Sequence, residues 1–483
     1  MTEFPNLEYT PDEMRAMIDA VASRCIDHVA SLPTQPVIGD VGATDVFRRM
    51  QEGAPERGSP LEPLLDQLFR EYVPRSFTAP GPGYLAYVPG GGVFPAALAD
   101  FIADTTNRFT GIWQAAPALV QLEANALDWL RDWMGFPPTT RGLFTTGGSM
   151  ATFNAILCAR ERHLGPDIRR GVLYTSDQAH HCVLKAAKMA GIMPDRVRAI
   201  PCDESYRLPV NALRTGIASD RAAGLTPFCV VSTAGTTNTG AVDPLGAIAE
   251  LAAAEGLWHH VDGAYGAFFQ LCDQTRTVLG GLSRADSLTL DPHKGMFLPY
   301  GTGALLVRDG AALRAAHEAT ADYLPAMPHP DEFYDPSQHG PELSRGFPGL
   351  RVWLTVKMYG AATFRAAVAE KRALALEAYR RIAALPGIVI DAPPELSLFA
   401  FHVTWPGATP AEEDAATQAL MEETSARGRV MVSGAAARGR YVGRVCVLCF
   451  RTHAGEIDAL LDDMGAALAD IKERRKTESE VGS

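Results

Sequence analysis

The sequence predicts an α/β fold built on a mostly parallel sheet with helices on both faces. Between about residues 85 and 310, short apolar segments alternate with segments of helical spacing, which is typical of strands joined by crossover helices. Chemically distinctive side chains follow several of the apolar segments, as in open sheets whose ligands bind at the carboxyl ends of the strands. With 483 residues, the chain is long enough for two or three domains and a large core.

The N-terminal part is predicted to be helical. Residues 11–31 follow Thr10 and carry apolar side chains at helical spacing, and a second helix is expected around Leu61–Tyr72. Residues 33–60 are rich in Pro and Gly and predict an extended connector between these helices. Because two helices and a connector make no core of their own, we expect residues 1–85 to pack on another surface.

The rest of the chain is expected to form one large and one small unit. We place the large domain at 86–385 and a small C-terminal α/β domain at 386–483. Residues 320–345 are dense in Pro, Gly and His without periodicity, which predicts a mobile active-site loop. One long helix is expected from Leu350 to about Ala384. Strands of the small domain are expected at Ile388–Ile390, Leu396–Val403, Val430–Val432 and Val445–Phe450.

The composition is that of a cytoplasmic globular protein. The net charge of −12 argues against nucleic acid or an anionic membrane as a constant partner. No run approaches the roughly 18 apolar residues of a membrane span, and the first residues lack the basic and apolar regions of a secretory leader. The eight cysteines are scattered, which predicts reduced thiols and no metal site.

Lys294 is the most informative single residue. It ends a Pro292-His293-Lys294 corner between the β-prone segment Ser287–Leu290 and a second apolar run, Gly301–Val307. A lysine between two core segments is out of place as a solvated charge, because burial of an unpaired ammonium is costly or lowers its pKa. We therefore predict a lysine with a depressed pKa, whose free amine can attack a carbonyl and form a Schiff base.

Three further strand-to-helix joints carry groups of complementary chemistry. In the joint within Gly142–Arg160, the backbone N–H groups near Gly148 and the Ser149 hydroxyl would form an anion site at a helix N-terminus. Asp262 ends a buried strand, and His180 lies in a turn after another strand. A phosphate cradle, a carboxylate for a ring nitrogen, a histidine to lie on a ring and an imine-forming lysine together indicate a pyridoxal phosphate (PLP) site.

The chain resembles the group II PLP-dependent amino-acid decarboxylases, the family of the aromatic amino-acid, glutamate and histidine decarboxylases. Seven stretches match in family order between about residues 80 and 360, and weaker similarity continues to Arg451-Thr452. They are Ala86–Pro89 with Phe94–Asp100, Gly148-Ser149, Ser176–His180, Ser232–Thr237, His260–Tyr265, His293-Lys294 and Arg351–Trp353. The resemblance implies the aspartate aminotransferase-like fold type I with a seven-stranded type of sheet, PLP as cofactor, and a homodimer in which residues 1–85 pack on the partner subunit.

The resemblance implies four catalytic residues. Lys294 would form the Schiff base and later act as an acid or base near the substrate Cα. Asp262 would pair with the pyridine nitrogen and keep it protonated, so that the ring accepts the electrons of a broken Cα bond. His180 would stack on the ring and touch the substrate carboxylate. Tyr334 is the candidate for the loop tyrosine that returns a proton to Cα.

The resemblance also implies which residues bind the cofactor, in addition to Lys294, Asp262 and His180. Gly148 and Ser149 would bind the phosphate, with help from His293 and Thr233. Ala264 would pack against the ring face opposite His180, where a small side chain leaves room.

Several departures from the aromatic branch bear on the reaction. Gly295 follows the lysine in place of Trp, Gly90 stands where a hydroxyl residue is expected, and Gly111 stands near an expected aromatic contact. Tyr334 is two residues from the expected position, which Pro336 occupies. These departures argue against an aromatic substrate and against simple decarboxylation. We expect decarboxylation of an L-amino acid first, with aldehyde-forming oxidative decarboxylation or β-elimination as alternatives.

A hydrolase is the main hypothesis from another class. Ser149 lies in a stretch that loosely resembles a nucleophile elbow, and Ser149, Asp262 and His293 follow the chain order of an α/β-hydrolase triad. The elbow pattern fails at Ala151, and this hypothesis leaves Lys294 without a role. A dinucleotide-binding dehydrogenase is weaker, because no G-x-G-x-x-G precedes the candidate ribose-binding residue Asp167. A PLP enzyme should be yellow and bleach with borohydride, which neither alternative predicts.

Overall fold

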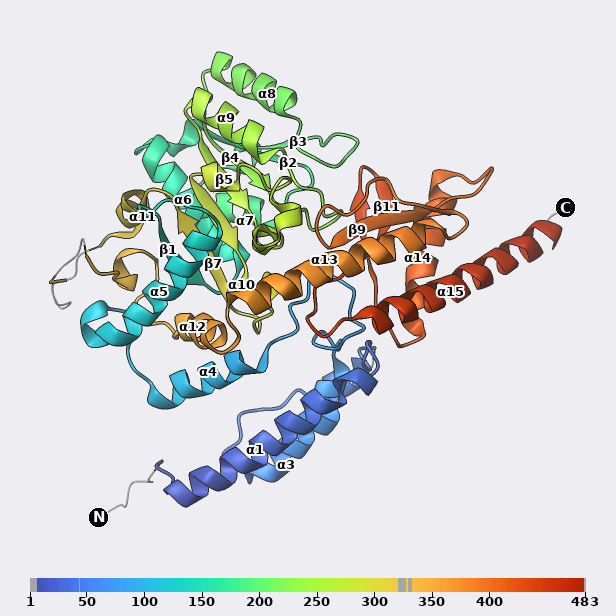
Figure 1. Ribbon diagram of the computed structural model, residues 1–483, viewed down its shortest axis with the longest axis horizontal. Helices are drawn as coiled ribbons and strands as arrows, with labels where there is room; N and C mark the ends of the chain where they lie inside the picture. Colours follow the sequence, from blue (N-terminus) through green and yellow to red (C-terminus); the bar gives the residue numbers. More distant parts are fainter. Residues whose placement is uncertain (1–6, 43, 320–326, 329–331, 482–483) are drawn as a thin grey trace.

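The computed structural model describes residues 7–42, 44–319, 327–328 and 332–481. Figure 1 shows the N-terminal helices α1 (Pro11–Ser31) and α3 (Leu61–Gln67) lying together, a central sheet wrapped in helices, and a C-terminal unit that carries the long helix α15 (Ala454–Val481). Part of the predicted mobile loop 320–345 lies outside the described residues. The domain boundaries drawn from the sequence stay predictions.

A seven-stranded sheet forms the centre of the large unit. In spatial order, the strands run β1-β7-β6-β5-β4-β2-β3. Among the described strands of this sheet, β7 alone runs in the opposite direction to the others, so the predicted mostly parallel α/β fold is confirmed. The strands are β1 (Arg141–Thr145), β2 (Gly171–Ser176), β3 (Val197–Ile200), β4 (Thr226–Thr233), β5 (Trp258–Asp262), β6 (Ser287–Leu290) and β7 (Gly303–Val307).

Helices cover both faces of this sheet because successive strand residues point to opposite sides. Leu143 and Leu173 pack with α6, α7 and α11, whereas the adjacent Phe144 and Tyr174 pack with helices of the other face. The carboxyl ends of β2, β4, β5 and β6 lead directly into the segments that hold the predicted site residues. The helices are α4 (Phe94–Thr106), α5 (Pro117–Trp133), α6 (Gly148–His163), α7 (Cys182–Met189), α8 (Val210–Ala222), α9 (Leu245–Glu255), α10 (Pro292–Gly295) and α11 (Gly310–His317).

The single long helix predicted from Leu350 to about Ala384 is wrong in one respect. The structure has two helices, α12 (Pro348–Tyr359) and α13 (Ala361–Ala383). They are separated by Gly360, whose φ of 77° lies in the left-handed region that glycine adopts readily and other residues rarely do. A glycine at this position ends one helix and redirects the chain into the next.

The C-terminal unit contains a four-stranded antiparallel sheet in the order β10-β11-β9-β8. The strand predicted at Val430–Val432 is misplaced, because the hairpin begins three residues later and turns at Arg438 and Gly439, with φ of 49° and 74°. Strand β10 consists mainly of Ala and Gly, so its sequence lacks the alternation of large apolar and polar residues that would indicate a strand. The elements are β8 (Ile388–Val389), β9 (Leu398–Val403), α14 (Pro410–Ala426), β10 (Ser433–Ala437), β11 (Arg440–Cys446) and α15 (Ala454–Val481).

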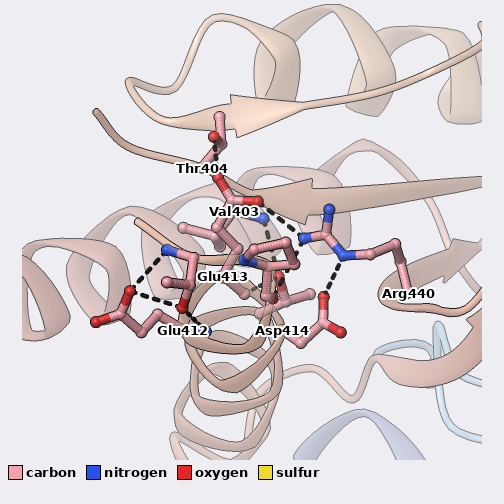
Figure 2. Close-up of polar contacts among 9 residues, drawn as sticks. Val403, Thr404, Glu412, Glu413, Asp414 and Arg440 are labelled. Carbon is pink, nitrogen blue, oxygen red and sulfur yellow. Dashed lines mark hydrogen bonds and ion pairs between the residues drawn. The ribbon is translucent and has the colours of Figure 1, made fainter. Parts of the chain in front are cut away.

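Arg440 fastens the β10–β11 hairpin to helix α14. Figure 2 shows its guanidinium between two carboxylates of the first turns of α14, with Nε 2.8 Å from Asp414 Oδ1 and a terminal nitrogen 2.8 Å from Glu413 Oε2. Glu413 also accepts a hydrogen bond from Thr404, the residue after β9. These contacts join the β10–β11 hairpin, helix α14 and the end of β9 through one charged cluster.

The N-terminal segment contains α1 (Pro11–Ser31), α2 (Thr44–Arg49) and α3 (Leu61–Gln67). The predicted helix at residues 11–31 is confirmed, and Thr10 and Glu13 form a capping box at its start. Helix α1 contacts α3, where Arg24 pairs with Asp66, yet α1 buries none of its side chains within this chain. No helix in the described part of the chain is long and apolar enough to cross a membrane.

Candidate active site

One cavity of about 260 Å³ lies where the carboxyl ends of the central strands meet the following helices. Its wall contains all eight residues that the sequence and the resemblance selected for cofactor binding: Gly148, Ser149, His180, Thr233, Asp262, Ala264, His293 and Lys294. Eight further residues line the same wall and were not assigned to the cofactor site from the sequence: Thr146, Gly147, Met150, Cys182, Gly235, Thr237, Tyr265 and Asp291.

The start of helix α6 provides an anion site in this wall. The N–H groups of Met150 and Ala151 are bound by the carbonyl of Gly147, at 3.1 and 3.2 Å. The preceding N–H groups, of Gly148 and Ser149, have no carbonyl within the helix because they belong to its first turn. A β-carbon on Gly148 would lie 3.0 Å from the Ala264 β-carbon, so a side chain here would fill the space. Glycine keeps room for a phosphate against the helix N-terminus.

Asp262 ends strand β5 and is buried in the cavity wall. Its Oδ1 accepts a hydrogen bond of 3.1 Å from the Ala264 N–H, which fixes the carboxyl group. Burial raises the pKa of Asp262, and the nearby Lys294 ammonium opposes this shift. A buried carboxyl held in this way can pair with a cationic ring nitrogen.

Thr233 is held beside Asp262 at the end of β4. The two residues are register partners in the parallel sheet. The Thr233 N–H donates to Asp243 Oδ2 at 2.7 Å, and the Asp243 N–H donates back to the Thr233 carbonyl at 3.0 Å. Its position in the wall is therefore fixed by the backbone.

Lys294 enters the cavity from α10, but its pKa is shifted in the direction opposite to the prediction. Burial lowers the pKa of this ammonium, and the carboxylates of Asp291 and Asp262 outweigh that effect and raise it. The Nζ atom lies 3.1 Å from Asp291 Oδ2. The prediction of a depressed pKa for Lys294 was wrong, because it assumed a buried ammonium without a carboxylate partner. The i, i+3 spacing of the two residues on a helical turn was the signal that could have revealed the pair.

His180 is a neutral imidazole at the edge of the cavity. Burial, followed by the charges of His181, Lys294 and Lys185, lowers the pKa of His180 to about 4. Its Nδ1 accepts the Cys182 N–H at 3.3 Å, so in the neutral ring the proton is on Nε2. An uncharged ring fixed by a backbone N–H suits stacking on an aromatic cofactor.

His293 is oriented away from the triad that a hydrolase would need. Its Nδ1 lies 2.9 Å from the Thr302 carbonyl and must donate to it, because a carbonyl oxygen only accepts. A Ser–His–Asp triad requires that nitrogen to donate to the aspartate. The hydrolase hypothesis for Ser149, Asp262 and His293 is therefore wrong.

Tyr334 does not line the cavity that holds the other predicted site residues. Its side chain is buried in the main core cluster, with its ring centroid 5.0 Å from that of His339. The adjacent Phe333 stacks on Trp113 at 4.9 Å. The role of Tyr334 as a proton donor stays a prediction, and it would require this side chain to leave its packed position.

Two of the glycines that depart from the aromatic branch are required by packing. A β-carbon on Gly295 would lie 2.6 Å from the Phe268 β-carbon, and one on Gly111 would lie 2.0 Å from the Leu343 carbonyl oxygen. Both distances are far shorter than a real contact, so neither position accepts a larger residue without a shift of the chain. Packing against these neighbours is therefore a reason for glycine at both positions that does not depend on the substrate.

An anion-binding helix start, a buried carboxyl, a neutral histidine and a paired lysine around one cavity define a PLP-dependent enzyme. The sequence matches the family described as the pyridoxal-dependent decarboxylase conserved domain over residues 44–404. It is 34% identical over 454 residues to an aromatic-L-amino-acid decarboxylase of Bacillus atrophaeus, covering 94% of this chain and 95% of the relative. The chain belongs to the pyridoxal-dependent decarboxylase family.

Solved structures agree with this assignment. The Oryza sativa TDC with PLP and tryptamine superposes with a TM-score of 0.91 at 27% identity, covering 97% of this chain and all of that one. A 4-hydroxyphenylacetaldehyde synthase of Rhodiola rosea superposes with a TM-score of 0.88 at 25% identity, covering 96% of this chain and 99% of that one. The predicted fold type I, the PLP cofactor and the carbon–carbon lyase class are thereby confirmed.

Proposed function

We propose that this amino-acid decarboxylase acts on an aromatic L-amino acid and releases the corresponding amine. The reaction class is supported by the cavity with all eight expected cofactor-binding residues in a chain that matches the pyridoxal-dependent decarboxylase family. The substrate class is supported by the names of the relatives, which include aromatic-L-amino-acid and tryptophan decarboxylases. Packing supplies a reason for Gly295 and Gly111 that is independent of the substrate, so these departures are compatible with an aromatic side chain.

The bound cofactor supplies an electron sink for the pair left when the bond to the carboxylate breaks. In our proposal, the Gly148 and Ser149 N–H groups and the Ser149 hydroxyl hold its phosphate, assisted by Thr233 and His293. Ala264 packs on its ring. Asp262 holds a proton at the ring nitrogen, which makes the sink effective.

The proposed catalytic residues Lys294 and His180 both line the cavity. Lys294 lines the cavity and would hold the cofactor through its side-chain amine until the substrate amine takes its place. The neutral ring of His180 stacks on the cofactor, and its Nε2–H can donate to the substrate carboxylate. A poorly solvated pocket around that carboxylate favours loss of its charge as carbon dioxide.

The substrate proposal is tested with a panel of aromatic and aliphatic L-amino acids. Carbon dioxide, amine, ammonia and peroxide are measured in the same reaction, since their ratio identifies the reaction as well as the substrate. We expect carbon dioxide and amine in equal amounts with tryptophan, tyrosine or phenylalanine. Turnover of aliphatic or acidic amino acids only would refute the aromatic assignment.

Aldehyde formation is the second candidate reaction. It is favoured by the position of Tyr334, which is packed in the core rather than in the cavity wall, and the Rhodiola rosea aldehyde synthase has the same fold. If oxygen reaches the reacting carbon before a proton does, the products are aldehyde, ammonia and peroxide. The same panel separates the two reactions, because an aldehyde synthase consumes oxygen and yields little amine.

We also propose that the enzyme is a symmetric homodimer in which residues 1–85 pack on the partner subunit. Helix α1 buries no side chain within its own chain, and five of its apolar residues are exposed: Met14, Ile18, Val21, Ile26 and Val29. Helix α4 adds Phe94, Leu98, Phe101 and Ile102 to the exposed apolar surface. Apolar patches of this kind are typical of subunit interfaces.

We therefore expect light scattering to give a dimer of the 51.9 kDa chain. Deletion of residues 1–60 should abolish activity and expose apolar surface, which leads to aggregation. Substitution of Ile18 and Ile26 by Asp should dissociate the dimer, because both side chains belong to the exposed apolar surface of α1. Arg15→Asp is the matched control, because Arg15 is an exposed polar residue of the same helix, where it pairs with Asp12, and this change should leave the dimer intact. A fully active monomer would contradict this proposal.

The cytoplasm is proposed as the location of the enzyme. All eight cysteines are free in the structure, and six of them are buried. Reduced buried thiols are usual in a reducing compartment. Fractionation of cells that express the protein would test this assignment.

A further inference from the structure

Asp291 is a charged residue of the cavity that the proposed mechanism leaves without a role. Its side chain is 2% exposed, and its Oδ2 contacts Lys294 Nζ at 3.1 Å. The second oxygen, Oδ1, is buried and has no hydrogen-bond partner in the described structure. A buried carboxylate oxygen without a partner is costly, so the residue needs an explanation beyond stability.

Asp291 Oδ2 has two basic neighbours, Lys294 and His293, and the lysine is the one that donates a hydrogen bond to it. His293 Nε2 is 3.6 Å from Oδ2, but His293 already donates through Nδ1 to Thr302, and burial lowers the pKa of its ring. A neutral ring with its proton on Nδ1 offers no hydrogen to the carboxylate. Among these neighbours, the Lys294 ammonium is therefore the one that stabilises the Asp291 charge.

We propose that Asp291 is a positioning residue that keeps Lys294 protonated and aimed into the cavity, so that Lys294 returns the proton to the substrate carbon. This inference deepens the proposed function and rests on it, because it assigns the donor that decides between amine and aldehyde. Lys294 can act from its described position, whereas Tyr334 would first have to leave the core.

The protons balance in this scheme. Exchange of amines on the cofactor leaves Lys294 as an ammonium that carries protons brought by the substrate ammonium, and Asp291 stabilises this charge. When the bond between Cα and the carboxylate breaks, carbon dioxide leaves without the electron pair. A proton from Lys294 Nζ then forms the new C–H bond, and the neutral lysine amine takes the cofactor back. The released amine gains one proton from water, so no oxidant is consumed.

Other groups around Lys294 also influence its charge. Asp262 and Asp291 favour the ammonium, together with the thiols of Cys182 and Cys446 and the Tyr300 hydroxyl if they ionise. His180 and His293 would oppose it if protonated, but burial lowers the pKa of both rings. Asp291 is distinguished from Asp262 by its direct bond to Nζ, and Asp262 is already assigned to the ring nitrogen.

The first test uses the cofactor-free protein and measures a lysine rather than turnover. Acetic anhydride modifies neutral amines, so its rate at Lys294, measured by mass spectrometry across pH, gives the midpoint of lysine ionisation. Exposed Lys188 in the same digest is the internal reference. In Asp291→Asn we expect the midpoint at Lys294 to fall by about 1–3 pH units. Asp291→Glu should retain a high midpoint, and Asp309→Asn, at an exposed helix cap, should match wild type.

The second test measures products in air with an amino acid that the wild-type enzyme decarboxylates. We expect Asp291→Asn to raise the ratio of aldehyde to amine by about tenfold, with ammonia and peroxide, because a hydrogen bond to a charged group is lost. Asp291→Glu should restore the amine. An unchanged lysine midpoint or an unchanged product ratio in Asp291→Asn would overturn the inference, and so would diversion to aldehyde by Tyr334→Phe alone.

Failure of the proposed function is separately visible. If the wild-type protein releases no carbon dioxide from any amino acid, the decarboxylase proposal fails and the donor role of Lys294 fails with it. If decarboxylation proceeds but the lysine midpoint does not depend on Asp291, the decarboxylase proposal stands and only the inference on Asp291 is lost.

Discussion

Replacement of Lys294 by Ala is expected to abolish turnover, with a loss on the order of 10³-fold or more, since both a covalent anchor and an acid–base group disappear. The side chain projects into the cavity from α10 and contributes no apolar packing to the core clusters, so the fold should be retained. Borohydride treatment of the wild-type protein should fix the cofactor to the peptide that contains Lys294. The Ala variant should bind cofactor without covalent attachment.

Lys188→Ala is the matched control, because this lysine is exposed on the neighbouring helix α7. It should keep wild-type turnover and wild-type cofactor attachment. Circular dichroism of both variants would show whether the fold is intact. Normal activity of the Lys294 variant, or borohydride labelling at a different lysine, would remove the basis of the site assignment.

The sheet was predictable because its signal is local. Strands such as β2 and β7 are buried along their whole length and appear in the sequence as short, largely apolar segments. The sequence did not reveal the division between α12 and α13 or the position of β10, because the first depends on a single backbone conformation and the second on a tertiary contact. Gly360 divides a continuous helical pattern through its φ angle, and the β10 strand of Ala and Gly residues is defined by pairing with β11.

The site was predictable to the extent that each residue lies at the end of a recognisable strand. Asp262 and Thr233 end neighbouring parallel strands and necessarily meet at one edge of the sheet. The charge state of Lys294 was predicted in the wrong direction, because a pKa depends on partners at a few ångströms rather than on the burial of one segment. Asp291 was overlooked for the same reason. Its i, i+3 spacing from Lys294 permits the 3.1 Å contact, but the sequence alone shows neither that this contact forms nor that the other carboxylate oxygen is left unpaired.

Exchange of Asp262 for Asn is expected to lower turnover by about 100-fold, which corresponds to ~2.7 kcal/mol of lost transition-state stabilisation. Asn keeps the size of the side chain and can still accept the Ala264 N–H through its carbonyl oxygen, so the cavity should keep its shape. It removes the charge that favours a protonated ring nitrogen. The electron sink then weakens although the cofactor is bound.

The charge effect of Asp262 can be separated from a packing effect by reading the ring nitrogen directly. With ¹⁵N-labelled cofactor, the nitrogen chemical shift should indicate a protonated ring in the wild-type protein and a neutral ring in Asp262→Asn. Asp262→Glu, which keeps a carboxylate on a longer side chain, should retain protonation and recover part of the turnover. A neutral ring nitrogen in the wild-type protein, or near-normal turnover of the Asn variant with cofactor bound, would contradict this role. Because the carboxyl of Asp262 is buried and fixed by Ala264, we expect the nitrogen signal and turnover to change together.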